Sequence, residues 1–130
     1  MRLFSLPVFL CHAILKTMAD SLLDKKCVPC EGSTKPLTRA EAIRQVSDLR
    51  ATWDLSPDAL KISCVFEFGT FRDAVGFVNK VADLAEREGH HPDIHISYSV
   101  VTIELWTHAI KGLSENDFIL AAKIEHLLGA

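Results

Sequence analysis

The spacing of apolar residues along the chain changes between a helical and a strand-like period. Apolar residues at three- and four-residue intervals predict a helix over residues 71–85, which Gly89 is placed to end. A second series, from Phe118 to Leu128, predicts a helix that runs to the C-terminus. Between these segments the apolar positions alternate with polar ones, which is typical of strands with one buried face.

Four segments have this strand-like pattern. Residues 60–68, 94–98 and 101–108 alternate clearly, and in the last of these Val101, Ile103 and Leu105 share one face. A shorter strand is expected at residues 52–55, followed by a turn.

Three helix starts have the same signal, a hydroxyl residue followed three positions later by a carboxylate. They are Thr38-x-x-Glu41, Thr70-x-x-Asp73 and Ser114-x-x-Asp117. The order of elements is therefore α-β-β-α-β-β-α. Paired strands on short connections favour an α+β fold, with a four-stranded antiparallel sheet covered on one face by three helices.

Residues 1–33 differ from the rest and are expected to lie outside the fold, which leaves residues 34–130 as the domain. An apolar stretch follows Arg2, and no acidic residue precedes Asp20, so the segment is either a targeting sequence or a dispensable extension. Cys27-Val-Pro-Cys30 lacks the second pair of ligands that structural zinc needs. We expect two ordinary thiols on a flexible arm.

Composition narrows the function classes. The 130 residues are 48% hydrophobic and 24% charged, which fits one globular domain and excludes a disordered chain. The net charge of −3 argues against a nucleic-acid binder. No apolar run reaches the roughly 18 residues of a membrane span. Four cysteines are too few for a disulfide scaffold.

The candidate chemistry lies in the histidines, four of which fall between residues 90 and 108. His90 and His91 follow the helix stop, and His108 ends the last strand. A hairpin that turns near residues 98–100 would bring His108 back beside His90 and His91. Asp117 could close the same corner.

Three imidazoles and a carboxylate suit proton transfer near neutral pH, and they also suit zinc. Adjacent histidines on an extended backbone point in opposite directions, which argues against both holding one metal ion. Each histidine could instead be a surface residue, and Asp117 is already explained as a helix-capping carboxylate. The residues alone leave an acid–base site ahead of a metal site.

One pattern with fixed gaps resembles the signature of the pterin-4a-carbinolamine dehydratases. It reads Glu86-x3-His90-His91-Pro92-x5-Tyr98-x9-His108-x8-Asp117. Residues 36–128 are similar to that family beyond the signature, including Pro36-Leu37-Thr38, Phe71-Arg72-Asp73-Ala74 and Gly112-Leu113-Ser114.

The resemblance implies a lyase that dehydrates 4a-hydroxytetrahydropterin to quinonoid dihydropterin and so recycles a tetrahydrobiopterin-type cofactor. It implies a homodimer or homotetramer that needs no metal and no organic cofactor. The family's catalytic histidines correspond to His90, His91 and His108, and its acidic site residues to Glu86 and Asp117, which would bind the substrate or orient the imidazoles. Ile94 and Asn116 stand where the family often has an aromatic and a basic residue, a difference that concerns contacts with the substrate's side chain.

Two other functions stay open at this stage. Family members in animals also act as dimerisation cofactors of a homeodomain transcription factor, so a protein-interaction role is the alternative. A three-histidine zinc hydrolase is the other. The expected location is the cytoplasm, or a mitochondrion or plastid if residues 1–33 act as a transit segment.

Overall fold

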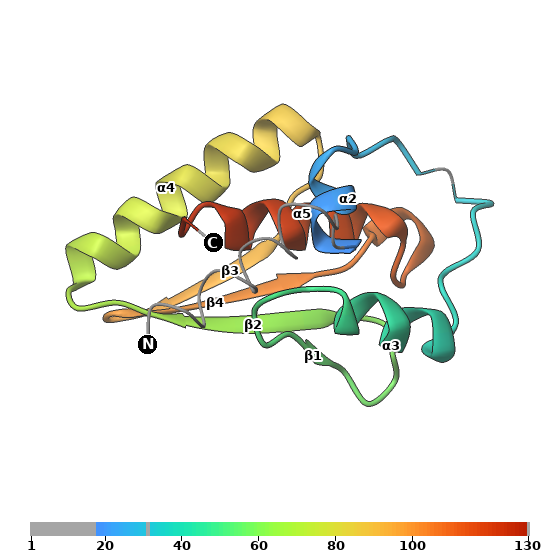
Figure 1. Ribbon diagram of the computed structural model, residues 1–130, viewed down its shortest axis with the longest axis horizontal. Helices are drawn as coiled ribbons and strands as arrows, with labels where there is room; N and C mark the ends of the chain where they lie inside the picture. The colour runs from blue at the N-terminus through green and yellow to red at the C-terminus, as the bar shows by residue number, and fades with distance from the viewer. Residues whose placement is uncertain (1–17, 31, 130) are drawn as a thin grey trace, which may run out of the picture.

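A four-stranded antiparallel sheet forms one layer of the molecule, with its strands in the order β1-β2-β4-β3. The computed structural model describes residues 18–30 and 32–129. In chain order (Figure 1) the elements are α2 (Met18–Leu23), α3 (Arg39–Ser47), β1 (Asp54–Leu55), β2 (Ile62–Glu67), α4 (Phe71–Glu88), β3 (Asp93–Ser97), β4 (Val100–Leu105), the short 3-10 helix η1 (His108–Ile110) and α5 (Glu115–His126). From α3 onward this order confirms the predicted α+β fold.

The alternation of the strands decides which face of the sheet is buried. Cys64 in β2 is paired with Ile103 in β4, and both side chains are buried. Ile94 in β3 is paired with the same Ile103, so the apolar positions of all three strands share one face. Helices α4 and α5 lie over that face (Figure 1). The opposite face has the polar positions, including His95 opposite Thr102.

Helix α5 is the centre of the core. Nine of its twelve residues are buried, among them Phe118, Leu120 and Ile124. A helix buried on nearly all sides must have neighbours on all sides. Here the sheet lies below it and α4 and α2 lie beside it (Figure 1).

The ends of α4 are formed as its sequence predicts, although its buried stripe is different. The Thr70 hydroxyl accepts from the Asp73 N–H at 3.0 Å, and Gly89 ends the helix with a φ of 67°. The buried stripe is made by Ala74, Phe77, Val81, Leu84 and Ala85. Phe71, the first residue of the predicted apolar series, is 53% exposed and lies outside this stripe.

The hairpin between β3 and β4 turns where the sequence predicts. Ser97 is paired with Val100, so the connection has two residues, and Tyr98 adopts a φ of 53°. The Phe68 N–H donates to the Ser99 carbonyl at 2.9 Å, which attaches the hairpin tip to the end of β2. Tyr98 points to solvent at 72% exposure and is not part of the apolar face.

The expectation that residues 1–33 lie outside the fold is wrong for the part that the structure describes. Helix α2 lies against α5 (Figure 1), and Leu22 is 5% exposed. Residues 24–30, which we call the N-terminal arm, continue along the domain, and Cys27 is 7% exposed within the core. The arm is therefore packed on the domain. The possible targeting stretch at residues 1–17 lies outside the described residues.

Glu88, at the end of α4, anchors the arm. Its Oε1 accepts from the Cys27 N–H at 3.0 Å, and its Oε2 accepts from Lys123 Nζ of α5 at 2.7 Å. Burial works to raise the pKa of Glu88, but the hydrogen bonds from Lys123 and the Cys27 N–H outweigh it and hold the pKa below its usual value of 4.5.

Glu125 anchors the loop before β1 in a similar way. This buried carboxylate accepts from the N–H groups of Arg50 and Ala51, both at 2.8 Å, and from Trp53 Nε1 at 3.1 Å. It satisfies three donors of a loop that has no sheet partner at that point. The loop is thereby fixed against α5.

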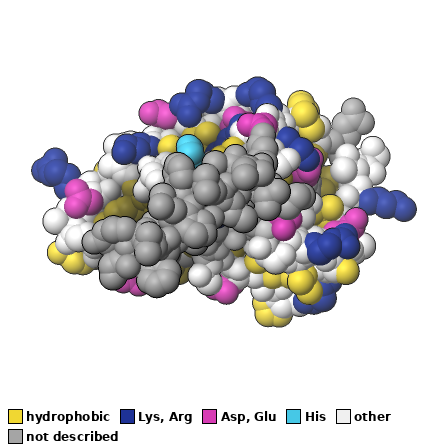
Figure 2. All heavy atoms as spheres, viewed as in Figure 1, with side chains coloured by type: hydrophobic (Ala, Val, Ile, Leu, Met, Phe, Trp, Pro, Cys, Tyr) yellow, Lys and Arg dark blue, Asp and Glu magenta, His cyan; other side chains and the backbone are white. Residues whose placement is uncertain are grey.

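Charged side chains of both signs are mixed on the face shown in Figure 2, where Lys and Arg are interspersed with Asp and Glu. Among the described residues, the helices include none with the length and apolar composition to cross a membrane.

We predict that Glu125→Ala lowers the free energy of unfolding by at least about 2 kcal/mol, because three donors lose their acceptor in a buried place. Urea unfolding followed by circular dichroism measures the change. Glu115→Ala on the same helix is the control, since its exposed pair with Lys25 is worth under about 1 kcal/mol. Equal losses in the two variants would contradict the structural role of Glu125.

A second prediction concerns pH. Because the pKa of Glu88 is lower in the folded chain, its stabilisation is fully present above about pH 4.5 and is lost as the pH falls through the folded pKa. Glu88→Gln should therefore lower the melting temperature at pH 7, and the gap to wild type should narrow as the pH falls below 4.5. Thermal unfolding from pH 7 to pH 3 measures this gap, with Asp83→Asn on the exposed side of α4 as the control. A gap that stays constant over the whole range would show that the charge of Glu88 is not involved.

Candidate acid–base site

The three histidines singled out in the sequence line one cavity of about 230 Å³. His90 and His91 lie between α4 and β3, and His108 begins η1. The lining also includes Asn116 of α5 and the end of the N-terminal arm.

The sheet register explains how the histidines come together. Gly89 turns the chain out of α4, so His90 and His91 stand just before β3. Asp93, at the start of β3, is paired with Glu104, near the end of β4. The residues that follow β4 are therefore next to those that precede β3, as the predicted hairpin requires. His108 itself is not on the strand, because β4 ends at Leu105.

His90 is the most constrained of the three imidazoles. Its Nε2 lies 2.6 Å from Oδ1 of Asp117, and the side chains of the two residues are 12% and 0% exposed. The other oxygen of Asp117 accepts from the Thr107 hydroxyl at 2.8 Å and from the Ser114 N–H at 3.0 Å. Since a carboxylate only accepts, Nε2 of neutral His90 has the hydrogen and Nδ1 is the free acceptor. Asp117 thus caps α5 and orients His90 at once.

His91 has a carboxylate partner of a different kind. Its Nε2 lies 2.5 Å from Oε2 of Glu86, which is in the last turn of α4. Both side chains are exposed, at 61% and 75%. The pair lies at the rim of the cavity, where water screens it.

His108 lies against Trp106, with 4.0 Å between the ring centroids. Trp106 also lines the cavity. Its Nε1 donates to Oδ2 of Asp93 at 2.9 Å, which fixes the indole plane. Among the other histidines, His95 lies on the exposed face of the sheet and His126 on α5, both outside the lining of this cavity, and His12 lies outside the described residues.

Sequence reasoning missed one wall of this cavity. It is formed by Val28, Pro29 and Cys30 of the N-terminal arm. The available sequence signal for this wall is the Cys27-x-x-Cys30 motif, which we expected to lie on a flexible arm. That interpretation is wrong, because Cys27 is buried and Asn116 binds the arm through hydrogen bonds.

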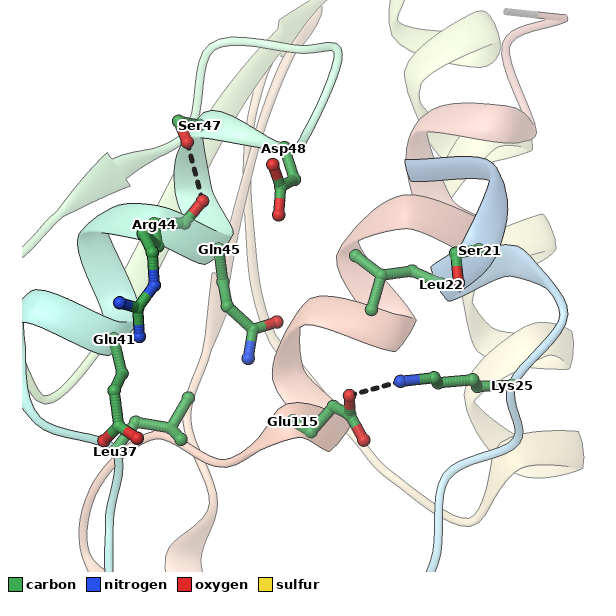
Figure 3. A pocket seen from close by; sticks show the side chains of 10 residues that line it. All are labelled: Ser21, Leu22, Lys25, Leu37, Glu41, Arg44, Gln45, Ser47, Asp48 and Glu115. Atoms are coloured by element: carbon green, nitrogen blue, oxygen red, sulfur yellow. Dashed lines mark hydrogen bonds and ion pairs between the residues drawn. The ribbon is translucent and has the colours of Figure 1, made fainter. Parts of the chain in front are cut away.

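A larger cavity of about 430 Å³ lies elsewhere, between α2, α3 and the start of α5 (Figure 3). Lys25 and Glu115 form an ion pair on one side, and Arg44 and Gln45 of α3 lie on the other. Its lining has no imidazole and no thiol. Groups suited to proton transfer near neutral pH therefore gather in the smaller cavity.

The described residues include no group of three or more His, Cys, Asp or Glu side chains arranged to hold a metal ion. His90 and His91 point to different carboxylates, as adjacent residues on an extended backbone do. The expected zinc alternative has no ready ligand set in this part of the chain.

Comparisons with known proteins all identify the same family. The family model described as pterin 4 alpha carbinolamine dehydratase matches residues 35–127. A protein of Rickettsia bellii is 45% identical over 111 residues, which are 85% of this chain and 97% of that protein. A protein of Halorhodospira halophila is 47% identical over 107 residues, which are 82% and 97% of the two chains. Both relatives have the name "Putative pterin-4-alpha-carbinolamine dehydratase".

Two solved structures are also similar. The crystal structure of a transcriptional coactivator/pterin dehydratase from Brucella melitensis has a TM-score of 0.67 and 30% identity, and the match covers 72% of this chain and 98% of that one. A pterin dehydratase-like protein, identified as a RuBisCO assembly factor in the alpha-carboxysome, has a TM-score of 0.54 and 26% identity over 62% of this chain and 93% of that one. With a family model that matches most of its length and curated relatives near 45% identity, this chain belongs to the pterin-4a-carbinolamine dehydratase family.

Proposed function

We propose that this chain is a hydro-lyase that converts 4a-hydroxytetrahydropterin to quinonoid dihydropterin by histidine acid–base catalysis, and so recycles a tetrahydrobiopterin-type cofactor. The observation that carries the proposal is the meeting of His90, His91 and His108 in one small cavity, with His90 bound to a fully buried carboxylate. Membership of the family supports the same reaction.

The reaction requires two proton transfers, one to the substrate and one from it, so the net protonation of the enzyme does not change. The bond from C4a to the hydroxyl oxygen breaks, and the oxygen takes a proton and leaves as water. A ring nitrogen next to C4a gives up a proton as the C=N double bond forms. One acid and one base with pKa values near neutrality are enough, and imidazoles are the side chains that supply both.

His90 suits the role of the base. Asp117 holds its Nε2 hydrogen, which leaves Nδ1 free to accept the proton from the ring nitrogen. The carboxylate behind the ring then stabilises the imidazolium that forms, since opposite charges at 2.6 Å attract strongly in a place shielded from water. Because Asp117 is fully buried, it is a positioning residue and does not touch the substrate.

His108 is then the acid that protonates the departing hydroxyl. It is exposed, so it can exchange its proton with water after each turnover. Trp106 beside it lines the cavity and supplies aromatic surface that a pterin ring can contact. We assign to His91 and Glu86, at the rim, the task of holding the polar edge of the ring.

The family resemblance also leads us to propose a homodimer or homotetramer in the cytoplasm. Size-exclusion chromatography with light scattering measures the assembly.

We predict that His90→Ala and His108→Ala each lower kcat for dehydration at least tenfold, because each removes one of two proton-transfer groups. Stopped-flow absorbance on synthetic 4a-carbinolamine measures the rate. His95→Ala is the matched control, since that imidazole is exposed on the opposite face of the sheet and should leave kcat unchanged.

Unchanged rates in both site variants would refute the acid–base assignment. Activity that is lost with a chelator and restored by zinc would favour the zinc hydrolase-like alternative. The protein-interaction alternative rests on the coactivator and assembly-factor roles of the two structural relatives. Capture of a helical partner that persists after loss of all three histidines, together with no dehydration by wild type, would favour it.

A further inference from the structure

The N-terminal arm completes the cavity that holds the three histidines. Val28, Pro29 and Cys30 line the same space as His90 and His108, although 60 to 80 residues separate the arm from these histidines in sequence. These arm residues lie before residue 35, where the family model begins to match. The wall they form therefore lies outside the segment that the family model matches.

Asn116 fixes this wall to the first turn of α5. Its Oδ1 accepts from the Val28 N–H at 2.9 Å, and its Nδ2 donates to the Val28 carbonyl at 2.5 Å. The same Nδ2 lies 3.4 Å from the sulfur of Cys30. Asn116 is 4% exposed, so its amide is committed to the arm. Its neighbour Asp117 binds His90, which places the arm and the proposed base on adjacent residues of one helix.

Cys27, which is also on the N-terminal arm, makes two further hydrogen bonds to the domain. Its N–H donates to Glu88, and its thiol donates to the Asn116 carbonyl at 3.5 Å. The arm is therefore held by hydrogen bonds at Cys27, immediately before the wall, and at Val28, within it. These bonds fix the position of the wall relative to the histidines.

The two cysteines of the motif have different surroundings. Cys30 is partly exposed and faces the cavity, whereas Cys27 and Cys64 are buried. Burial is the main cause that raises the pKa of Cys27 to about 12 and that of Cys64 to about 11. Because the thiolate is the reactive form, Cys27 and Cys64 are protected from thiol reagents. Cys30 is the exposed thiol of these three.

We propose that residues 28–30 are a specificity wall of the substrate cavity, in which Cys30 limits the size of the substituent on C6 of the pterin. The inference rests on the proposed function. C6 is separated from the reacting C4a by one ring nitrogen, so a substrate placed with C4a at the histidines has its C6 substituent in the same cavity. The cavity of about 230 Å³ is lined both by the three histidines and by residues 28–30, so a ring held at the imidazoles brings its C6 substituent toward the arm.

The first test is protection of Cys30 from alkylation in the full-length wild-type protein. Iodoacetamide modification is followed by peptide mass mapping, which separates Cys11, Cys27, Cys30 and Cys64. We expect Cys30 to react faster than Cys27 and Cys64, and 7,8-dihydrobiopterin, a pterin with no 4a-hydroxyl to lose, to slow its modification at least fivefold. Modification of Cys30 at the same rate with and without this pterin would overturn the proposal.

The second test is substrate preference. Cys30→Phe should raise the KM for a carbinolamine with a dihydroxypropyl group at C6 at least fivefold more than the KM for its 6-methyl counterpart. Cys30→Ser, which keeps a small side chain, should restore the wild-type ratio of the two KM values. Lys25→Ala is the control on the same arm, because Lys25 pairs with Glu115 outside this cavity. An unchanged ratio in Cys30→Phe would overturn the size limit.

The two tests separate this inference from the proposed function. If the protein is inactive on both substrates but the pterin protects Cys30, the specificity wall is supported and the dehydratase activity is refuted. An active enzyme with neither protection nor a changed KM ratio would refute the wall alone. Inactivity without protection would refute both.

Discussion

A buried carboxylate at the start of α5 connects parts of the chain that are far apart in sequence. Asp117 is fully buried and binds His90 from the end of α4, Thr107 from the end of β4 and Ser114 at the cap of its own helix. A buried carboxylate that lacked these donors would be strongly destabilising. The packing of α4, β4 and α5 must therefore satisfy Asp117, and the arrangement that does so also fixes the plane of His90.

Much of the fold could be predicted because its signals are periodic and local. The alternation that buries Cys64 opposite Ile103, and the capping signal at Thr70, each depend on neighbours within a few residues. The packing of the N-terminal segment could not be predicted in this way. Leu22 and Cys27 are single apolar residues without a period, and only the surface of α5 makes them part of the core. Glu88, an ordinary charged residue by its sequence context, holds Cys27 there.

The candidate site was predictable as far as sheet geometry determines it. The hairpin argument places His108 beside His90 and His91, and all three line one cavity. The hairpin argument could not predict the wall formed by the N-terminal arm, since no spacing rule relates Asn116 to Val28. For Asp117 the sequence left two interpretations open, a helix cap and a member of the histidine corner, and in the structure it does both. Contacts between side chains of distant segments leave no periodic trace.

The two tryptophans occupy separate compartments of the molecule. Trp53 is buried in the core with its Nε1 on Glu125, whereas Trp106 lines the cavity and touches His108. Unfolding changes the surroundings of both indoles, whereas a molecule in the cavity or a change in the charge of His108 would change the surroundings of Trp106 alone. The intrinsic fluorescence of the folded chain is therefore expected to respond to occupation of the cavity through Trp106, without any added label.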